Sequence, residues 1–238
     1  MCLISIAQHA SPRWALVLAA NRDEFYARPT RPAHVWEDDA RIVGGRDLQA
    51  GGSWLALRRG GRVAAVTNVR GVGRAEGGPS RGLLVSQFVR GDQTPAAYAE
   101  SIDGDDYAGF HLIVGDGELV HRWNSGPIAT IEGLFAVSNA PPEAHWEKVD
   151  IARDYLASAI ERHDRADDLA SDLLRFLSTP RGGPIQQEIF VSLPIYGTRS
   201  STVIIIEPDG KSLFVEQNYG VGRRVGEAVR FLRYPAGQ

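Results

Sequence analysis

Four pairs of short apolar runs, each joined by a brief turn, constrain the fold of this chain more than any other feature. Runs of this length rich in Val, Ile, Leu and Ala are typical of buried strands, and a Gly or Pro turn between two of them predicts a β-hairpin. The paired runs are 3–8 with 14–20, 54–58 with 62–68, 110–115 with 118–123 and 203–207 with 212–216. Two further strands are expected at 134–138 and about 225–233.

Helical periodicity occupies the middle of the chain. It covers about 82–90, 95–102, 144–162 and 167–178, and in the third segment Val149, Ala152, Leu156 and Ile160 share one face. Strands at both ends with helices between them predict an α+β fold of stacked sheets covered by helices. Since the sequence has no repeat and no Pro/Ser-rich linker, a single domain over residues 1–238 is expected.

Composition excludes several classes of function. The net charge is −3 without a basic block, which argues against nucleic acid as a partner and against an anionic membrane. The apolar run 14–20 is too short to cross a membrane and lacks the preceding cationic stretch of a secretory signal, so no stable membrane insertion is expected. We therefore expect a cytoplasmic protein, in which a lone thiol stays reduced.

Metal and cofactor sites are not indicated. The single cysteine excludes an internal disulfide and a Cys-cluster metal site. The six histidines are scattered without ligand spacing and are expected to be structural or exposed: His9, His34, His111, His121, His145 and His163. The prediction is therefore no metal and no cofactor.

That single cysteine is Cys2, directly after the initiator methionine. Methionine aminopeptidases remove Met1 when the next side chain is small, which would leave Cys2 with a thiol and a free α-amine. Because such an amine has a pKa near 7.7–8.0, it can accept a proton at neutral pH and serve as a base for the thiol. The alternative is that Cys2 is merely part of an unstructured terminus.

Polar clusters follow several of the predicted strands. Asn21-Arg22-Asp23-Glu24 comes directly after the second strand, which is expected to return beside Cys2. Arg22 could then favour the thiolate, and Asp23 could orient the α-ammonium. Taken alone, four polar residues in a row are more often a solvated turn.

The other clusters have the same ambiguity. Asn68 and Asn139 each close a strand, where an Asn is either a turn former or an oxyanion donor. Arg199 precedes the strongest apolar strand, and its ordinary interpretation is a solvated loop. The glycines around Arg46, Asp47 and Trp54 serve either tight turns or close approach to a ligand.

An ordered series of motifs resembles the NRDE family, which includes the transport and Golgi organisation 2 proteins and many bacterial relatives. The motifs span essentially the whole chain: M-C-L-I at 1–4, L-A-A-N-R-D-E-F at 18–25, R-P-T at 28–30, G-G-R-D at 44–47, G-G-S-W-L-A at 51–56, T-N-V-R at 67–70, S-R-G at 80–82, S-N-A-P at 138–141 and T-R-S-S-T at 198–202. The family looks like a branch of the N-terminal nucleophile hydrolases. The resemblance implies a four-layer αββα sandwich of two stacked, mainly antiparallel sheets flanked by helices.

The resemblance also implies site roles, by analogy with choloylglycine and penicillin V acylases. Cys2 would be the nucleophile, Arg22 with Asp23 the orienting pair, and Asn68 and Asn139 would form the oxyanion hole and hold the amine; Arg199 would complete the site. In the acylases two residues separate the Arg and Asp, whereas Arg22 and Asp23 are adjacent here, so Glu24 is an alternative carboxylate. Candidate substrate-binding residues are Glu24, Arg46, Asp47, Trp54 and Arg70.

Two functions follow from this inventory. The first is a cysteine hydrolase that cleaves an amide or related acyl bond of a small-molecule substrate through an acyl-enzyme on Cys2. The second is a non-catalytic carrier of haem, lipid or acyl-CoA that uses the same pocket. A partner-binding scaffold with a vestigial site is a third reading.

Overall fold

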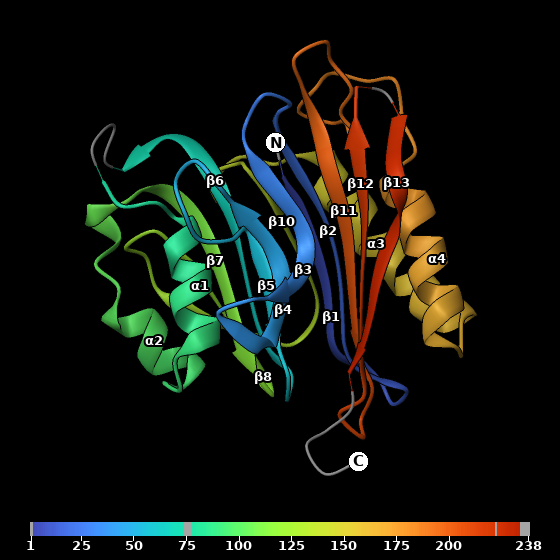
Figure 1. Cartoon of the computed structure of the whole chain (residues 1–238), viewed down its shortest axis with the longest axis horizontal. Coiled ribbons are helices and arrows are strands. Elements are labelled where there is room, and N and C mark those ends of the chain that lie inside the picture. The colour runs from blue at the N-terminus through green and yellow to red at the C-terminus, as the bar shows by residue number, and fades with distance from the viewer. Residues whose placement is uncertain (1, 74–77, 222, 234–238) are drawn as a thin grey trace. The chain divides into compact units, whose positions relative to one another are not determined.

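The computed structural model describes residues 2–73, 78–221 and 223–233, and its contacts fall into two compact units (Figure 1). Unit 1 comprises residues 1–28, 132–138 and 144–234, and unit 2 comprises 29–131, 139–143 and 235–238. Both units are assembled from segments that are distant in the sequence. The expectation of a single domain over residues 1–238 stays a prediction.

Unit 1 is built on a six-stranded antiparallel sheet with strand order β10-β1-β2-β11-β12-β13. Its strands are β1 (Leu3–Ser11), β2 (Trp14–Phe25), β10 (Gly133–Ser138), β11 (Tyr196–Ile206), β12 (Ser212–Gly220) and β13 (Arg223–Arg233). The helices α3 (Glu147–Arg162) and α4 (Ala166–Leu177) lie along this sheet (Figure 1). The most extensive pairing joins β2 to β11.

Side-chain alternation explains how this sheet is filled. Leu3, Ala19 and Val203 point to the face that packs on Leu156 and Leu173 of the two helices. The opposite face is also apolar and buried, through Ile4, Ile6, Leu18, Ile204 and Phe214. A sheet with two buried faces accounts for the nearly continuous apolar runs in the sequence.

Unit 2 is built on a seven-stranded antiparallel sheet in which sequential strands are neighbours. Its strands are β3 (Thr30–Trp36), β4 (Asp39–Asp47), β5 (Leu55–Arg58), β6 (Arg62–Gly73), β7 (Ala108–Asp116), β8 (Glu118–Trp123) and β9 (Ile128–Ile131). The helices α1 (Gly82–Arg90) and α2 (Pro95–Ser101) and the short 3₁₀ helix η1 (Gly104–Asp106) complete the unit. Phe88 and Tyr98 of the helices pack with Trp36, Val66 and Leu112 of the sheet.

The predicted strands and helices are confirmed, but β2 continues to Phe25 and β11 begins at Tyr196. The polar clusters 21–24 and 197–202, predicted to lie outside these strands, are therefore parts of them. Three strands were not predicted: β3, β4 and β9. β3 contains Pro32, which an edge strand tolerates because one side of its backbone makes no ladder, and its polar residues leave it without a long apolar run. β4 begins and ends with charged residues, and β9 has only four residues, so neither has a long apolar run.

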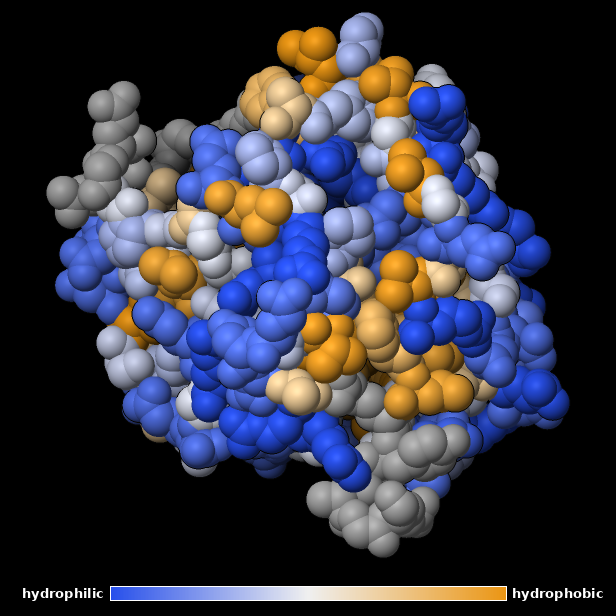
Figure 2. Space-filling view, in the orientation of Figure 1, coloured by the Kyte–Doolittle hydropathy of each residue, from blue (hydrophilic) through white to orange (hydrophobic). Residues whose placement is uncertain are grey.

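On the face in Figure 2, hydrophobic side chains form separate patches among hydrophilic ones. Within the described residues, none of the helices is both long and apolar enough to cross a bilayer.

One buried carboxylate ties α3 to α4. Asp172 accepts hydrogen bonds from Tyr155 Oη (2.8 Å), Arg162 Nη2 (2.7 Å) and His163 Nε2 (3.0 Å), and another from Arg175. Burial alone would raise the pKa of Asp172, but these donors outweigh it and hold the pKa well below its usual range. Asp172 is therefore ionised in the fold at every pH near neutrality.

We predict that Asp172→Asn lowers the free energy of unfolding by about 1–3 kcal/mol, since Arg162 and Arg175 lose their shared anion. Chemical denaturation at neutral pH measures the loss. Because the native pKa is depressed, this contribution is complete above about pH 5 and is lost progressively as the pH falls from about 4 toward the native pKa. Asp168→Asn on the same helix is the control, since Asp168 is exposed beside Arg165. Equal stability of the two variants would contradict the role of Asp172.

Candidate functional site

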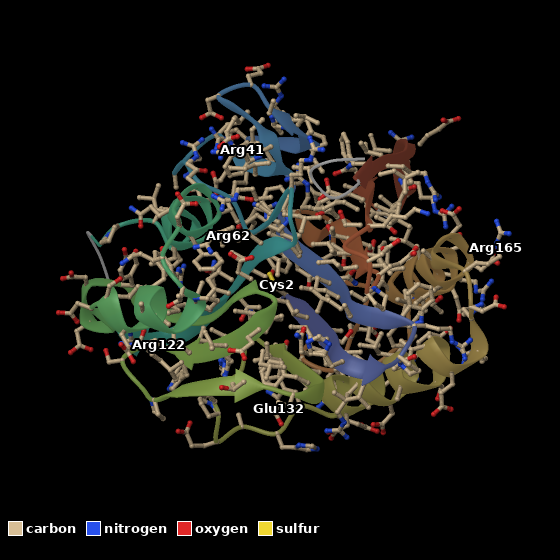
Figure 3. The ribbon with its side chains drawn as sticks, turned by 90° about the horizontal axis from the view of Figure 1, so that it is seen from below. Cys2, Arg41, Arg62, Arg122, Glu132 and Arg165 are labelled. Atoms are coloured by element: carbon tan, nitrogen blue, oxygen red, sulfur yellow. The ribbon has the colours of Figure 1, made fainter. Side chains whose placement is uncertain are left out.

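Cys2 directly precedes β1 in unit 1, where β1 pairs with β2 and β10. The next residue, Leu3, pairs with Asn21 on β2 and with Ser138 on β10. Ser138 Oγ donates a hydrogen bond of 2.6 Å to the carbonyl oxygen of Cys2, and the Cys2 thiol points at the carbonyl oxygen of Asp23, 4.0 Å from Sγ. The sulfur is half-buried and labelled in Figure 3. Residue 2 is thus an ordered part of the site rather than a loose end.

Asp23, whose backbone carbonyl faces this thiol, carries a buried carboxyl group. Its Oδ1 accepts a 2.7 Å hydrogen bond from Thr198 Oγ1, and Thr198 Oγ1 in turn accepts one of 2.9 Å from the amide of Val191. Burial raises the pKa of Asp23, against the charge of Lys148 and the Thr198 hydroxyl, which lower it. The carboxylate therefore depends on nearby positive charge to stay ionised.

Arg22 and Glu24 lie on the face of β2 opposite to Asp23. Arg22 is 7% exposed, and its Nη2 is 3.9 Å from Glu24 Oε2. Glu24 Oε2 is also 3.7 Å from Arg28 Nε, and Oε1 accepts a hydrogen bond from the amide of Phe25. Adjacent positions on a strand point to opposite faces, so the two candidate carboxylates have different neighbours. Asp23 is the one whose residue contacts Cys2, while Glu24 neutralises arginines.

Asn21 has a structural role that the sequence did not reveal. Its Nδ2 donates to the carbonyl oxygens of Leu177 and Ile189, both at 2.8 Å, and its Oδ1 accepts from Ser201 Oγ at 2.6 Å. These bonds join β2 to the end of α4, to the segment before β11 and to β11 itself. Asn21 is 2% exposed and its amide is satisfied at both ends.

Arg199 occupies a bulge, because the pairing of β11 with β2 skips a residue between Thr198 and Ser200. Its Nη1 donates to three carbonyl oxygens of the turn after β2, those of Phe25 (2.9 Å), Tyr26 (3.1 Å) and Arg28 (3.2 Å). Burial lowers the pKa of Arg199, against the charge of Glu24. In unit 1 this guanidinium fixes the turn that follows the Arg22–Glu24 cluster.

Lys148 is a site residue that sequence reasoning missed. It is fully buried in the first turn of α3, where Nζ donates to the carbonyl oxygen of Glu188 at 3.3 Å and lies 5.2 Å from the centre of the Trp146 ring. Burial lowers its pKa, while the charges of Asp23, Cys2 and Glu188 raise it. The sequence contained one indication of this role. Lys148 lies four residues before Ala152 and therefore on the apolar face of the predicted helix, where a charged residue is unusual.

Unit 2 brings the two predicted asparagines together. Asn139 Nδ2 donates to the carbonyl oxygen of Asn68, and among the described residues Asn139 Oδ1 is buried without a hydrogen-bond partner. The following residue, Ala140, is held by a 2.7 Å hydrogen bond from His111 Nε2. His111 Nδ1 lies 3.0 Å from His121 Nε2, and burial lowers the pKa of both rings, that of His121 to about 3. A neutral histidine pair therefore anchors the Asn139 segment.

The predicted substrate-binding residues of unit 2 have structural contacts there. Arg46 Nη2 is 3.1 Å from Asp38 Oδ2, and its guanidinium lies 4.2 Å from the centre of the Trp36 ring. Asp47 Oδ1 accepts from the amides of Gln49 and Ala50 in a turn. Arg70 belongs to β6, but its side chain lies outside the described part of the chain.

Two glycines in these motifs are explained by close packing. A Cβ at Gly45 would lie 2.0 Å from the Trp54 ring, and Gly52 has a φ of +79° with the backbone of Gly82 2.3 Å from its Cβ position. A side chain fits at neither place. Of the two readings of these glycines, the turn and packing reading accounts for both positions.

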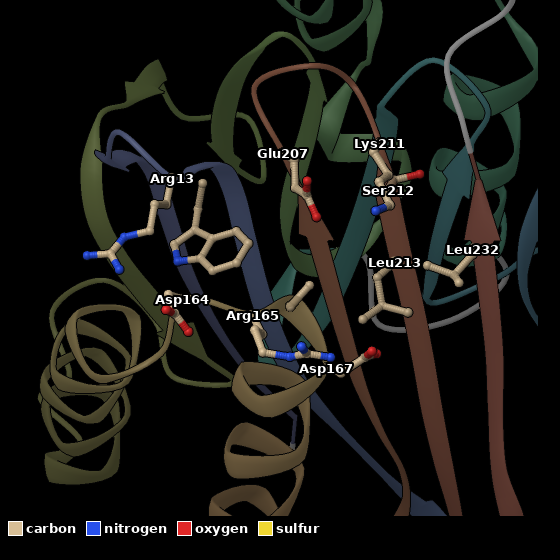
Figure 4. Close-up of a pocket in the computed structure, with 11 residues that line it drawn as sticks. Arg13, Asp164, Arg165, Asp167, Glu207, Lys211, Ser212, Leu213 and Leu232 are labelled. Carbon is tan, nitrogen blue, oxygen red and sulfur yellow. The ribbon is translucent and has the colours of Figure 1, made fainter. Parts of the chain in front are cut away.

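A separate cavity lies at the opposite end of the six-stranded sheet. It has a volume of about 410 Å³ and is lined at the hairpin turns and the start of α4 (Figure 4). Its ionic lining alternates in sign: Arg13, Arg165 and Lys211 with Asp164, Asp167 and Glu207. None of the predicted site residues lines it. Across the described residues, no group of three His, Cys, Asp or Glu side chains could hold a metal ion.

Comparison with solved structures shows the fold. The chain is similar to an N-acylethanolamine-hydrolyzing acid amidase ortholog from Caenorhabditis elegans, with a TM-score of 0.51, 15% identity and coverage of 88% of this chain and 95% of that one. It is also similar to the C2A mutant of a conjugated bile acid hydrolase from Clostridium perfringens, with a TM-score of 0.54, 9% identity and coverage of 96% and 92%. Both have the N-terminal nucleophile hydrolase fold, so the predicted α+β class and αββα type are confirmed.

Comparison of sequences shows the family. The Transport and Golgi organization protein 2 homolog of Bos taurus is 31% identical over 256 residues, which cover 92% of this chain and 93% of the relative. The profile of the Transport and Golgi organisation 2 family matches residues 1–220. The resemblance in the motifs is thus confirmed, and the chain belongs to the Transport and Golgi organisation 2 family.

Proposed function

We propose that this protein is a cysteine N-terminal nucleophile hydrolase that cleaves an amide or related acyl bond. The observation that carries the proposal is the position of Cys2, an ordered residue directly before β1 whose thiol faces the backbone carbonyl of Asp23. Buried ionisable groups gathered around a nucleophile are typical of catalytic sites, and here Asp23 and Lys148 are such groups. The proposal includes removal of Met1, which makes the nitrogen of Cys2 a free amine.

The reaction proceeds through an acyl-enzyme. The α-amine of Cys2 takes the thiol proton, and the thiolate attacks the substrate carbonyl carbon to form a carbon–sulfur bond. As the carbon–nitrogen bond breaks, the α-ammonium returns the proton to the leaving amine. Water, deprotonated by the same amine, then attacks the thioester and releases the carboxylic acid with the thiol restored. No oxidant, metal or cofactor enters these steps.

The remaining predicted residues have assigned tasks in this proposal. Asn68 and Asn139 donate hydrogen bonds to the oxyanion and hold the amine, and such a donor contributes roughly 3 kcal/mol to transition-state stabilisation. Asp23 orients the α-ammonium, with Glu24 as the alternative carboxylate. Arg22 and Arg199 supply positive potential at the same end of unit 1. Their hydrogen bonds to buried and backbone groups support a pre-organised arrangement.

The structural relatives favour amide chemistry. One is named for hydrolysis of N-acylethanolamines and the other for hydrolysis of conjugated bile acids, and the latter was solved with its residue 2 changed from Cys to Ala. We infer a small-molecule acyl substrate for this chain, with Glu24, Arg46, Asp47, Trp54 and Arg70 as proposed substrate-binding residues. A cytoplasmic location, which keeps the thiol reduced, belongs to the same proposal.

The first prediction concerns processing. Intact mass spectrometry of the purified protein is expected to show a chain that lacks the mass of Met1, because the amine of Cys2 must be free to accept the thiol proton. Full retention of Met1 in active protein would rule out this mechanism.

The second prediction concerns the covalent intermediate. Incubation with a small library of acyl amides is expected to add an acyl mass to Cys2, removable by hydroxylamine, and Cys2→Ala abolishes it. Asp23→Asn should slow acylation by up to about 10⁴-fold, as loss of an orienting carboxylate does in a catalytic triad. Asp168→Asn, on the exposed side of α4, serves as the matched control.

The same experiment separates the hydrolase from a carrier. Saturable binding of haem, a lipid or acyl-CoA without an adduct or turnover, and equal in Cys2→Ala, would favour the carrier function and contradict the hydrolase.

A further inference from the structure

The first turn of α3 contains an unusual residue for its position. The stripe of α3 that faces the sheet consists of Lys148, Ala152, Leu156, Ala159 and Ile160, all buried. A cation in the first helical turn opposes the helix dipole, and complete burial adds a desolvation cost to the charge. Only two lysines occur in the chain, and this one occupies a place that packing alone would give to an apolar residue. Such local conflicts concentrate at functional sites.

The direct neighbours of the Lys148 ammonium do not neutralise its charge. Among the described residues it makes one hydrogen bond, to the carbonyl oxygen of Glu188, and one contact with the Trp146 ring. No carboxylate of a described residue forms a direct ion pair with it. A buried ammonium in this state requires negative charge slightly farther away.

The sheet directs that negative charge to the same side. Asn21 and Asp23 are two residues apart on β2, so they share the face that packs on α3 and α4, where Asn21 bonds to Leu177 of α4. The segment after Glu188 connects the two groups, because the amide of Val191 bonds to Thr198 and Thr198 bonds to Asp23. α3 itself packs on β1 and β10, the strands that end at Cys2 and Ser138. Lys148 of α3 and the Asp23 side chain of β2 therefore lie on the same side of the sheet, at the end where Cys2 is found.

We propose that Lys148 is a positioning residue of the Cys2 site, whose buried charge balances the Asp23 carboxylate and favours the thiolate of Cys2. The charge balance does not depend on the proposed function, but its role in catalysis rests on that function. The charge of Lys148 keeps Asp23 ionised. Because Asp23 is already balanced by Lys148, it can orient the α-amine without holding that amine permanently in its charged form. The amine is then free to exchange protons with the thiol.

The charged and titratable groups around Lys148 come from every element packed there. They are Cys2 before β1, Asp23 on β2, Glu188 in the segment before β11, and Tyr196 on β11, whose hydroxyl donates to the carbonyl oxygen of Asp23 at 3.3 Å. Of these, Asp23, Cys2 and Glu188 favour the charged form of Lys148 and burial opposes it.

The first test is a double-mutant cycle on stability. Lys148→Met leaves a buried carboxylate unbalanced, Asp23→Asn leaves a buried ammonium unbalanced, and the double variant leaves neither. We expect both single variants to be destabilised in chemical denaturation and the double variant to be less destabilised than their sum. Additive effects would overturn the coupling of the two groups. The double variant also keeps the test informative if one single variant folds poorly.

The second test measures the thiol directly and needs no substrate. Since Cys2 is the sole cysteine, the rate of iodoacetamide alkylation against pH reports on this thiol alone. In Lys148→Met we expect the midpoint of the profile to move up by about one pH unit, with about a tenfold lower rate near neutrality. Asp23→Asn should move it in the opposite direction. Lys211→Met, the only other lysine, is the control and should leave the profile unchanged.

The outcomes separate this inference from the proposed function. Shifted alkylation without acyl adducts would support the role of Lys148 and count against the hydrolase. Acyl adducts on Cys2 with the same alkylation profile in Lys148→Met and Lys211→Met would support the hydrolase and overturn the role of Lys148.

Discussion

The pairing of β2 with β11 is the constraint on which the rest of unit 1 depends. It joins residues 16–25 to residues 196–206. Its single irregularity is the bulge at Arg199, which changes the residues of β11 that pair with Arg22 and Asp23. Before the bulge Thr198 meets Asp23, and after it Ser200 meets Arg22. The alternation of β2 sets Asp23 on the helix side and Arg22 on the other side. The extra residue in β11 shifts its alternation, so that Thr198 lies on the side of Asp23 and Ser200 on the side of Arg22.

Sequence reasoning located the strands of unit 1 because both of their faces are buried, which makes Leu16–Ala20 and Val203–Ile206 unmistakable apolar runs. It also placed Cys2 near Arg22 and Asp23 from the expected return of a hairpin. It could not assign Asn21 or Lys148. The partners of Asn21 are the carbonyls of Leu177 and Ile189, more than 150 residues away, and no local pattern encodes such a contact. Lys148 interrupts an apolar stripe, so periodicity alone favours its neighbour Val149.

Unit 2 gives the complementary lesson about polar residues at strand ends. The sequence predicts that Asn68 and Asn139 each close a strand as a turn former or an oxyanion donor, and the fold joins them through one hydrogen bond. Arg46 and Asp47 had the same appearance in the sequence, but they contact Trp36, Asp38 and a local turn. The histidines had no ligand spacing, yet His111 and His121 meet because β7 and β8 are adjacent strands. Strand pairing, which the sequence does not specify over long distances, decides which of these groups interact.

The partners of the Asp23–Thr198 hydrogen bond are separated by 175 residues, so the ribosome synthesises Asp23 well before Thr198. At ribosomal rates of about 5–20 residues per second, β11 emerges roughly 10–35 s after β2. During that interval the hairpin of β1 and β2 has no third strand beside it, and its first residues project from the nascent chain. An exopeptidase that acts on emerging polypeptides thus meets Met1 before the sheet closes around its neighbour. By the topology itself, the proposed removal of Met1 would come before the thiol is enclosed.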